Sequence, residues 1–125
     1  MKITKINIGV NINDSTYPWT EAILSGQKTV ETRNSPTLDP YIGKRVGIIR
    51  TGKGQAQLVG FIDIVGKKIY NTIESFRADE KLHLVSEGGF FDFKGDGKIG
   101  YVLENPERIS VPVTVTSRGI VSRRI

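Results

Sequence analysis

The sequence of 125 residues contains no cysteine. This absence excludes a disulfide scaffold, a metal site with thiolate ligands and a cysteine nucleophile. It also fits a reducing compartment, and we expect a cytoplasmic protein. The single histidine, His83, cannot form a metal site by itself, and no acidic cluster stands beside it. We therefore expect no metal and no cofactor, and we interpret His83 as a structural residue on a helix surface or partly buried.

Long apolar runs are also missing. No uninterrupted stretch approaches the roughly 20 residues that a membrane helix needs, and polar sequence follows the opening Met-Lys-Ile-Thr-Lys. We therefore expect neither a membrane span nor a secretory signal. The length fits one domain, 1–125, most simply a monomer, with a core that needs no metal or disulfide.

Basic residues outnumber acidic ones, 18 to 13, which gives a formal net charge of +5. A basic balance favours an anionic partner such as a nucleic acid. The ordinary alternative is a solvated surface with a surplus of lysine and arginine. Part of the surplus lies at the end of the sequence, in Arg118, Arg123 and Arg124, where we expect a loose solvated tail.

The clearest predicted helix spans 17–26, with Pro18 near its start and Gly26 at its end in the left-handed conformation. Its apolar face consists of Trp19, Ile23 and Leu24. A second helix is expected over 72–84, capped by Asn71 or Thr72. The remaining pattern predicts strands at 28–33, 45–50, 55–65, 99–104 and 111–116.

Two of these strands, 45–50 and 55–65, form a predicted hairpin around a turn at 51–54. Asn105 and Pro106 are expected to end the strand 99–104, and a turn-rich loop is expected over 90–97. Pro112 indicates an edge position or a bulge in the strand 111–116. Several short strands with two helices indicate an α+β or mainly β fold, or a small β-barrel flanked by helices.

Two motifs resemble the ASCH family. The first is Pro18-Trp19-x3-Ile23-x2-Gly26-x-Lys28-x2-Glu31-x-Arg33, an aromatic-led helix followed by G-x-K-x-x-E-x-R. The second is Gly100-Tyr101-Val102-Leu103-Glu104-Asn105-Pro106, which resembles the closing strand of that family. The resemblance covers about residues 15 to 115. It implies a PUA-like fold, a compact β-barrel with helices beside it, and a cleft lined by the G-x-K-x-x-E-x-R segment.

The resemblance also implies two functions. Related domains bind RNA, which favours a module that binds RNA, a nucleoside or a nucleotide. Some members look like ribonucleases of single-stranded RNA, and some are amidohydrolases that remove the acyl group from N4-acylated cytidine with a Lys, a Thr and a Glu. The Lys matches Lys28, whereas the Thr position holds Glu31, and the third residue corresponds best to Glu87. A protein-interaction domain is the remaining alternative.

Lys28, Glu31 and Arg33 are the central candidates. Lys28 either acts as a general base with a lowered pKa, binds a phosphate, or pairs with Glu31 on the surface. Glu31 either accepts hydrogen bonds from a base, transfers a proton, or positions its basic neighbours. Arg33 is a candidate for a bidentate phosphate contact. Further candidates for ligand binding are the aromatic residues Tyr17 and Trp19, the basic residues Arg50 and Lys53, and Ser86.

Overall fold

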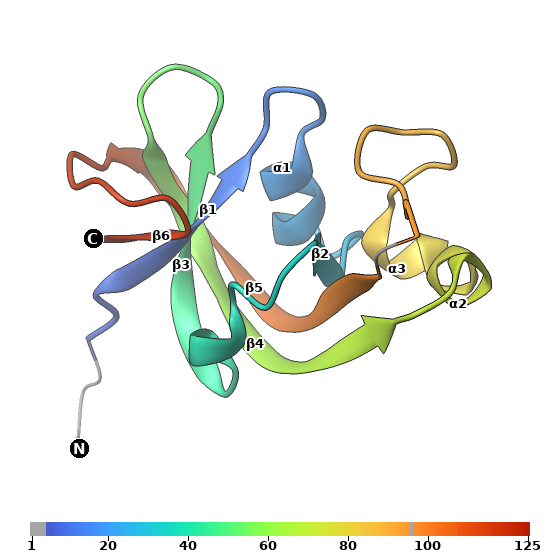
Figure 1. Cartoon of the computed structure of the whole chain (residues 1–125). Coiled ribbons are helices and arrows are strands. Elements are labelled where there is room, and N and C mark those ends of the chain that lie inside the picture. The colour runs from blue at the N-terminus through green and yellow to red at the C-terminus, as the bar shows by residue number, and fades with distance from the viewer. Residues whose placement is uncertain (1–4, 96) are drawn as a thin grey trace.

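A curled six-stranded sheet with the strand order β2-β5-β4-β3-β1-β6 forms half of a barrel in the computed structural model, which describes residues 5–95 and 97–125. Its strands are β1 (Ile8–Asn13), β2 (Val30–Arg33), β3 (Lys44–Thr51), β4 (Gln57–Tyr70), β5 (Lys98–Thr114) and β6 (Ser122–Arg124). The helical elements in these residues are α1 (Trp19–Leu24), the 3₁₀ helix η1 (Asp39–Tyr41), α2 (Ile73–Ala78) and α3 (Glu80–His83). Figure 1 shows β4 and β5 running together from the half-barrel toward α2 and α3.

The long antiparallel pair β4 and β5 forms the middle of the sheet, while β1 runs parallel to β3. The predicted hairpin is confirmed, because β3 pairs antiparallel with β4 around the turn that follows Thr51. Strand β4 extends to Tyr70, five residues beyond the prediction. Within the described residues, no helix is both long enough and apolar enough to cross a membrane.

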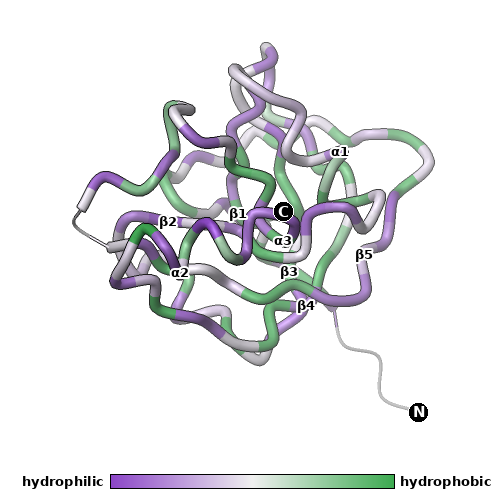
Figure 2. Tube along the Cα trace, turned by 90° about the vertical axis from the view of Figure 1, so that its right-hand side faces the viewer, coloured by the Kyte–Doolittle hydropathy of each residue, from purple (hydrophilic) through white to green (hydrophobic). Residues whose placement is uncertain are grey.

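Helix α1 fills the concave side of the sheet and lies between the β1 and β3 side and the pair α2 and α3 (Figure 1). Its Ile23 belongs to the main core, together with apolar residues of β1, β3, β4 and β5. A smaller core beneath α2 consists of Tyr70, Phe76 and Val85. Figure 2 shows hydrophilic and hydrophobic segments interleaved along the chain, as expected when each strand has one buried face.

The predicted end of a strand at 105–106 is wrong, because β5 continues through these residues to Thr114. Asn105 adopts a left-handed conformation with φ 55°, and the pairing with β4 shifts register three times along the ribbon. Such bulges absorb extra residues without ending the strand. Pro106 and Pro112 are tolerated because β2 pairs only with 99–102, which leaves this part of β5 at the edge of the sheet.

The predicted helix 72–84 is two short helices that meet at Asp79. The Asp79 carboxylate accepts hydrogen bonds from Lys68 Nζ at 2.8 Å and Tyr70 Oη at 2.7 Å, which hold this corner on β4. Thr72 caps α2 as predicted, since its side chain accepts a hydrogen bond from Ser75 N. The first predicted helix is also confirmed but shorter, and Gly26 follows it with φ 83°.

The expectation of a loose tail is wrong for Arg123 and Arg124, because both belong to β6, which pairs antiparallel with β1. Residues 1–4 and Asp96, which lies in the predicted loop 90–97, are outside the described residues. The described part of that loop lacks helix and strand, as the sequence predicts.

We predict that Gly60→Ala lowers the free energy of unfolding by about 1–3 kcal/mol, because overpacking forces neighbouring groups to move. A Cβ at Gly60 would lie 2.3 Å from the carbonyl oxygen of Glu107 and 2.5 Å from the Leu24 side chain. Gly66 in the same strand is the control, because nothing lies within 4 Å of its added Cβ. Urea unfolding of both variants tests this packing, and an equal effect of both changes would contradict it.

Candidate functional site

A cleft of about 340 Å³ opens beside β2, on the edge that does not pair with β5. Six regions distant in the sequence line it: β1, the start of α1, the segment 28–33, the end of β3, the segment after α3, and β6 with the residues that lead into it. Across this opening, Arg33 Nη2 of β2 donates a hydrogen bond of 2.9 Å to the carbonyl oxygen of Asn11 in β1. Three strands lie between β2 and β1 in the sheet order. The curvature of the sheet nevertheless brings β2 and β1 close together.

Aromatic side chains form one wall of the cleft. Trp19, the first residue of α1, meets Phe91 nearly edge to face, with 6.2 Å between the ring centroids. Tyr17 packs at a tilt on Trp19 at 4.4 Å but is 43% exposed and lies outside the cleft lining. The buried carboxylate of Asp14 holds α1 in place by accepting hydrogen bonds from Thr20 N at 3.1 Å and Thr20 Oγ1 at 2.5 Å.

Lys28 lines the cleft immediately before β2, with its side chain almost entirely buried. Its Nζ donates a hydrogen bond to the carbonyl oxygen of His83 and lies 3.7 Å from Glu31 Oε1 and 4.6 Å from the centroid of the Trp19 ring. Burial lowers the pKa of the Lys28 amine, and the Glu31 carboxylate offsets part of this effect. This amine therefore loses its proton more readily than the amine of an exposed lysine.

Glu31 and Arg33 form a second charged pair in the cleft. Arg33 Nε and Nη2 lie 3.1 and 3.0 Å from Glu31 Oε2, and both side chains are partly buried. Glu31 Oε1 faces Lys28 Nζ, and among the described residues Arg33 Nη1 donates no hydrogen bond. The cluster therefore keeps one guanidinium nitrogen for a ligand, and the structure brings together three residues that the motif predicted.

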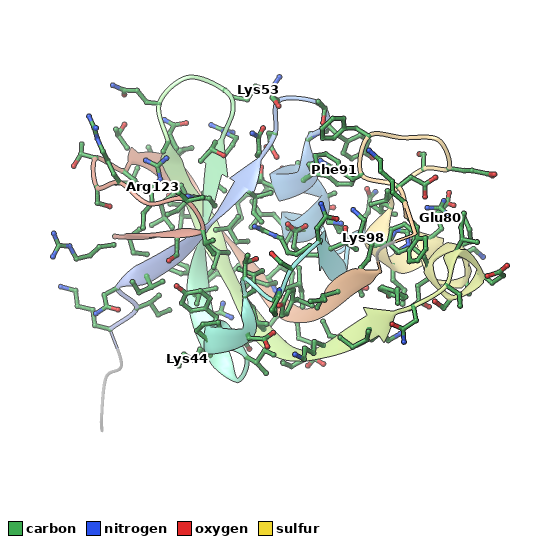
Figure 3. The ribbon with its side chains drawn as sticks, viewed as in Figure 1. Lys44, Lys53, Glu80, Phe91, Lys98 and Arg123 are labelled. Carbon is green, nitrogen blue, oxygen red and sulfur yellow. The ribbon has the colours of Figure 1, made fainter. Side chains whose placement is uncertain are left out.

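Asn11 organises the opposite wall, which sequence analysis missed. Besides accepting from Arg33, it donates from Nδ2 to the carbonyl oxygens of Gly119 and Ile120, at 2.9 and 3.0 Å. Its Oδ1 accepts a hydrogen bond of 3.1 Å from Arg123 Nε, and Arg123 also lines the cleft. Figure 3 shows Arg123 and Phe91 on different elements to either side of α1 and β1. No local motif marks these residues, because β6 pairing with β1 sets their positions.

The other predicted ligand residues lie elsewhere. Arg50 and Lys53 line a second cleft of about 440 Å³, described below. Ser86 and Glu87 are exposed in the segment after α3 and line neither cleft, although the preceding Val85 lines the first. Glu87 therefore lies outside the lining of the cleft that contains Lys28 and Glu31.

His83 is fully buried rather than on a surface. Its ring stacks on Phe76 with 4.0 Å between centroids, and its Nδ1 accepts a hydrogen bond of 2.9 Å from Val85 N. The nitrogen Nε2 must then carry the proton and donate to the carbonyl oxygen of Phe76 at 2.7 Å. This neutral ring fixes the turn in which the carbonyl oxygen of His83 accepts the hydrogen bond from Lys28. Burial lowers the pKa of His83.

The chemistry of the first cleft is ionic and aromatic. Among the described residues, no group of three His, Asp or Glu side chains gathers as metal ligands. The cleft instead combines a carboxylate, a buried amine, two guanidinium groups and an aromatic wall. Such a set can stack a flat ring, accept hydrogen bonds from an amino group, and bind an anion.

No protein-family model and no curated protein matches this sequence. Solved structures do share its fold. The crystal structure of ASCH from Zymomonas mobilis aligns with a TM-score of 0.69 at 20% identity, over 86% of this chain and 73% of that one. A tyrosine-to-phenylalanine mutant of that protein aligns at 0.69 and 19% identity, over 89% and 77% of the two chains. A serine-to-alanine mutant aligns at 0.71 and 20% identity, over 94% and 87%. The expectation of an ASCH fold, which is PUA-like, is confirmed.

The His83 geometry predicts that the ring titrates with a pKa below its usual value of about 6.5. Below about pH 6.5, His83 then binds a proton in the unfolded chain but not in the folded chain. The contribution of His83 to the free energy of unfolding is therefore fully present above about pH 6.5 and decreases as the pH falls below that value. Because His83 is the only histidine, its ring signals in an NMR titration report this group alone. A titration midpoint at or above pH 6.5 would contradict the assignment of His83 as a buried neutral ring.

Proposed function

We propose that this chain, a protein of ASCH fold, binds RNA or a nucleoside in the cleft that the G-x-K-x-x-E-x-R segment lines. The observation that supports this proposal is the meeting of Trp19, Lys28, Glu31 and Arg33 in one cleft. An aromatic wall, a carboxylate and guanidinium groups are the complements of a base ring, a base amino group and a phosphate. The net charge of +5 supports the same class of ligand.

Each lining group has a role in this proposal. A base packs against Trp19 and Phe91, where stacking contributes about 1–3 kcal/mol per base. Glu31 Oε1 accepts a hydrogen bond from the exocyclic amino group of the base, as carboxylates do with cytosine. Arg33 and Arg123, on opposite walls of the cleft, bind phosphate oxygens. Because phosphate contacts release counterions, the affinity for RNA falls as salt rises.

Trp19 is the only tryptophan, so its fluorescence reports the proposed site directly. We expect cytidine and single-stranded oligocytidylate to quench it, and Phe91→Ala to weaken binding by about 1–3 kcal/mol through the loss of one stacking surface. Titration of the fluorescence with each ligand measures the affinity.

The matched control for this titration is Phe90→Ala, because Phe90 is the neighbouring residue, is 74% exposed and does not line the cleft. We expect its affinity to equal that of the wild type. Equal losses in the two variants, or no quenching by either ligand, would refute binding in this cleft.

A second candidate function is hydrolysis, which the buried Lys28 with its lowered pKa favours. In this hypothesis Lys28 takes a proton from water while the water oxygen bonds to the acyl carbon of N4-acetylcytidine. Arg33 stabilises the oxyanion that forms. The C–N bond then breaks, the proton passes to N4, directly or through Glu31, and cytidine and acetate leave.

If the chain is this hydrolase, Lys28→Met lowers the rate of product formation by about 10²–10⁴-fold, the usual contribution of a general base. Methionine fills the buried volume without a charge, so the fold is retained. The assay incubates protein with N4-acetylcytidine and, separately, with labelled single-stranded RNA. Lys44→Met is the control, because Lys44 does not line the cleft and lies apart from the cleft residues Phe91 and Arg123 in Figure 3. Intact substrates with wild-type protein would exclude hydrolysis and leave the binding function.

A further inference from the structure

The second cleft, of about 440 Å³, lies directly next to the first. Asn13 and Thr51, which pair across β1 and β3, line the first cleft, and their chain neighbours Asp14 and Arg50 line the second. The segment 14–20, which leads into α1, contributes residues to both clefts.

Side chains at the start of α1 divide between the clefts in the same way. Trp19 lines the first cleft, whereas Pro18 and Thr20 line the second. Tyr17, exposed and packed on Trp19, lies in the dividing segment and offers an aromatic surface there. A ligand that leaves the first cleft across this segment therefore meets Tyr17 and then the second cleft.

Both acidic groups of the second cleft have internal hydrogen-bond partners. Asp14 is buried, and both of its oxygens accept hydrogen bonds from Thr20. Glu21 is held by Arg108 through two hydrogen bonds of 2.7 Å. This ion pair balances one negative charge with one positive charge, whereas the donors of Thr20 are neutral and do not cancel the charge of the Asp14 carboxylate.

Two further cations line this cleft and form no ion pair with any residue that the structure describes. Arg50 bonds only to the neutral amide of Gln57, through Nη2. Lys53 is exposed and has neither a hydrogen bond nor an ion pair within the described ranges. Figure 3 shows Lys53 on the loop between β3 and β4, at the same end of the molecule as the loop that precedes α1. With the three cations Arg50, Lys53 and Arg108 against the two carboxylates Asp14 and Glu21, the lining has a positive excess and attracts an anion.

We propose that the second cleft binds the phosphodiester of the nucleotide next to the base in the first cleft. The ligand is then single-stranded RNA that spans both clefts over Tyr17, rather than a free nucleoside. Arg50 and Lys53 contact its phosphate, and Tyr17 contacts the connecting nucleotide. This inference rests on the proposed function of the first cleft.

The test compares cytidine with a short oligocytidylate by Trp19 fluorescence, between about 50 and 200 mM salt. Oligocytidylate binds more tightly than cytidine. Lys53→Ala weakens oligocytidylate binding by about twofold to fivefold, the range of one exposed charge contact. It also lowers the slope of log affinity against log salt by about 0.7, the value for one phosphate on a single strand. The affinity for cytidine does not change.

The matched control is Lys44→Ala, because Lys44 is an exposed lysine at the opposite end of β3 from the loop that carries Lys53. It removes the same charge and leaves both affinities unchanged. Arg50→Gln is the second variant of the cleft, and its effect has the same direction as that of Lys53→Ala.

The possible failures are distinct. If neither cytidine nor oligocytidylate quenches Trp19, the proposed function itself fails. If both bind but Lys53→Ala and Arg50→Gln behave like the wild type, the second cleft alone is refuted. Equal losses of cytidine and oligocytidylate affinity in these variants also overturn the inference, because the residues then act on the first cleft.

Discussion

The bond between Arg33 and the backbone of Asn11 is the contact on which the first cleft depends. It joins β2 to β1 without strand pairing, so the sheet closes on one side through a guanidinium group rather than a ladder of backbone hydrogen bonds. A ladder would fill the opening, whereas a long side chain spans it and leaves room beneath. The same guanidinium holds Glu31, and Glu31 in turn faces Lys28. The Arg33 side chain thus both links β2 to β1 and holds the charged cluster together.

Charges buried in this way carry an energetic cost. Removing an amine from water is unfavourable unless partners compensate, and Lys28 has one backbone carbonyl, one carboxylate at 3.7 Å and the face of Trp19. The turn formed by His83 supplies the carbonyl, and the neutral ring of His83 holds that turn. A second layer of polar contacts therefore supports the cleft from behind, which is the arrangement expected where a side chain must keep a fixed position.

The sequence predicts the parts of the site that are local. The helix led by Trp19 and the segment Lys28 to Arg33 follow one another directly, so their spacing carries information about their contacts. Asn11, Phe91 and Arg123 reach the cleft through pairing and loop packing that span most of the chain, and no periodicity marks such contacts. Pro106 indicated a strand end because proline lacks an amide hydrogen, yet at a sheet edge that hydrogen is not needed. Arg50 and Lys53 were predicted as basic ligand residues, but the fold places them in a neighbouring cleft.

The hydrogen bonds of Asn11 to Gly119 and Ile120 connect positions 108 and 109 residues apart in the sequence. Contacts of such separation form slowly, because the chain must first lose the entropy of closing a very long loop. The hairpin of β3 and β4 closes only a short loop and has no such barrier. In kinetic terms, these separations predict that the β3 and β4 hairpin forms before the wall that carries Arg123. A molecule caught during refolding can therefore have most of its secondary structure while its recognition surface is still incomplete.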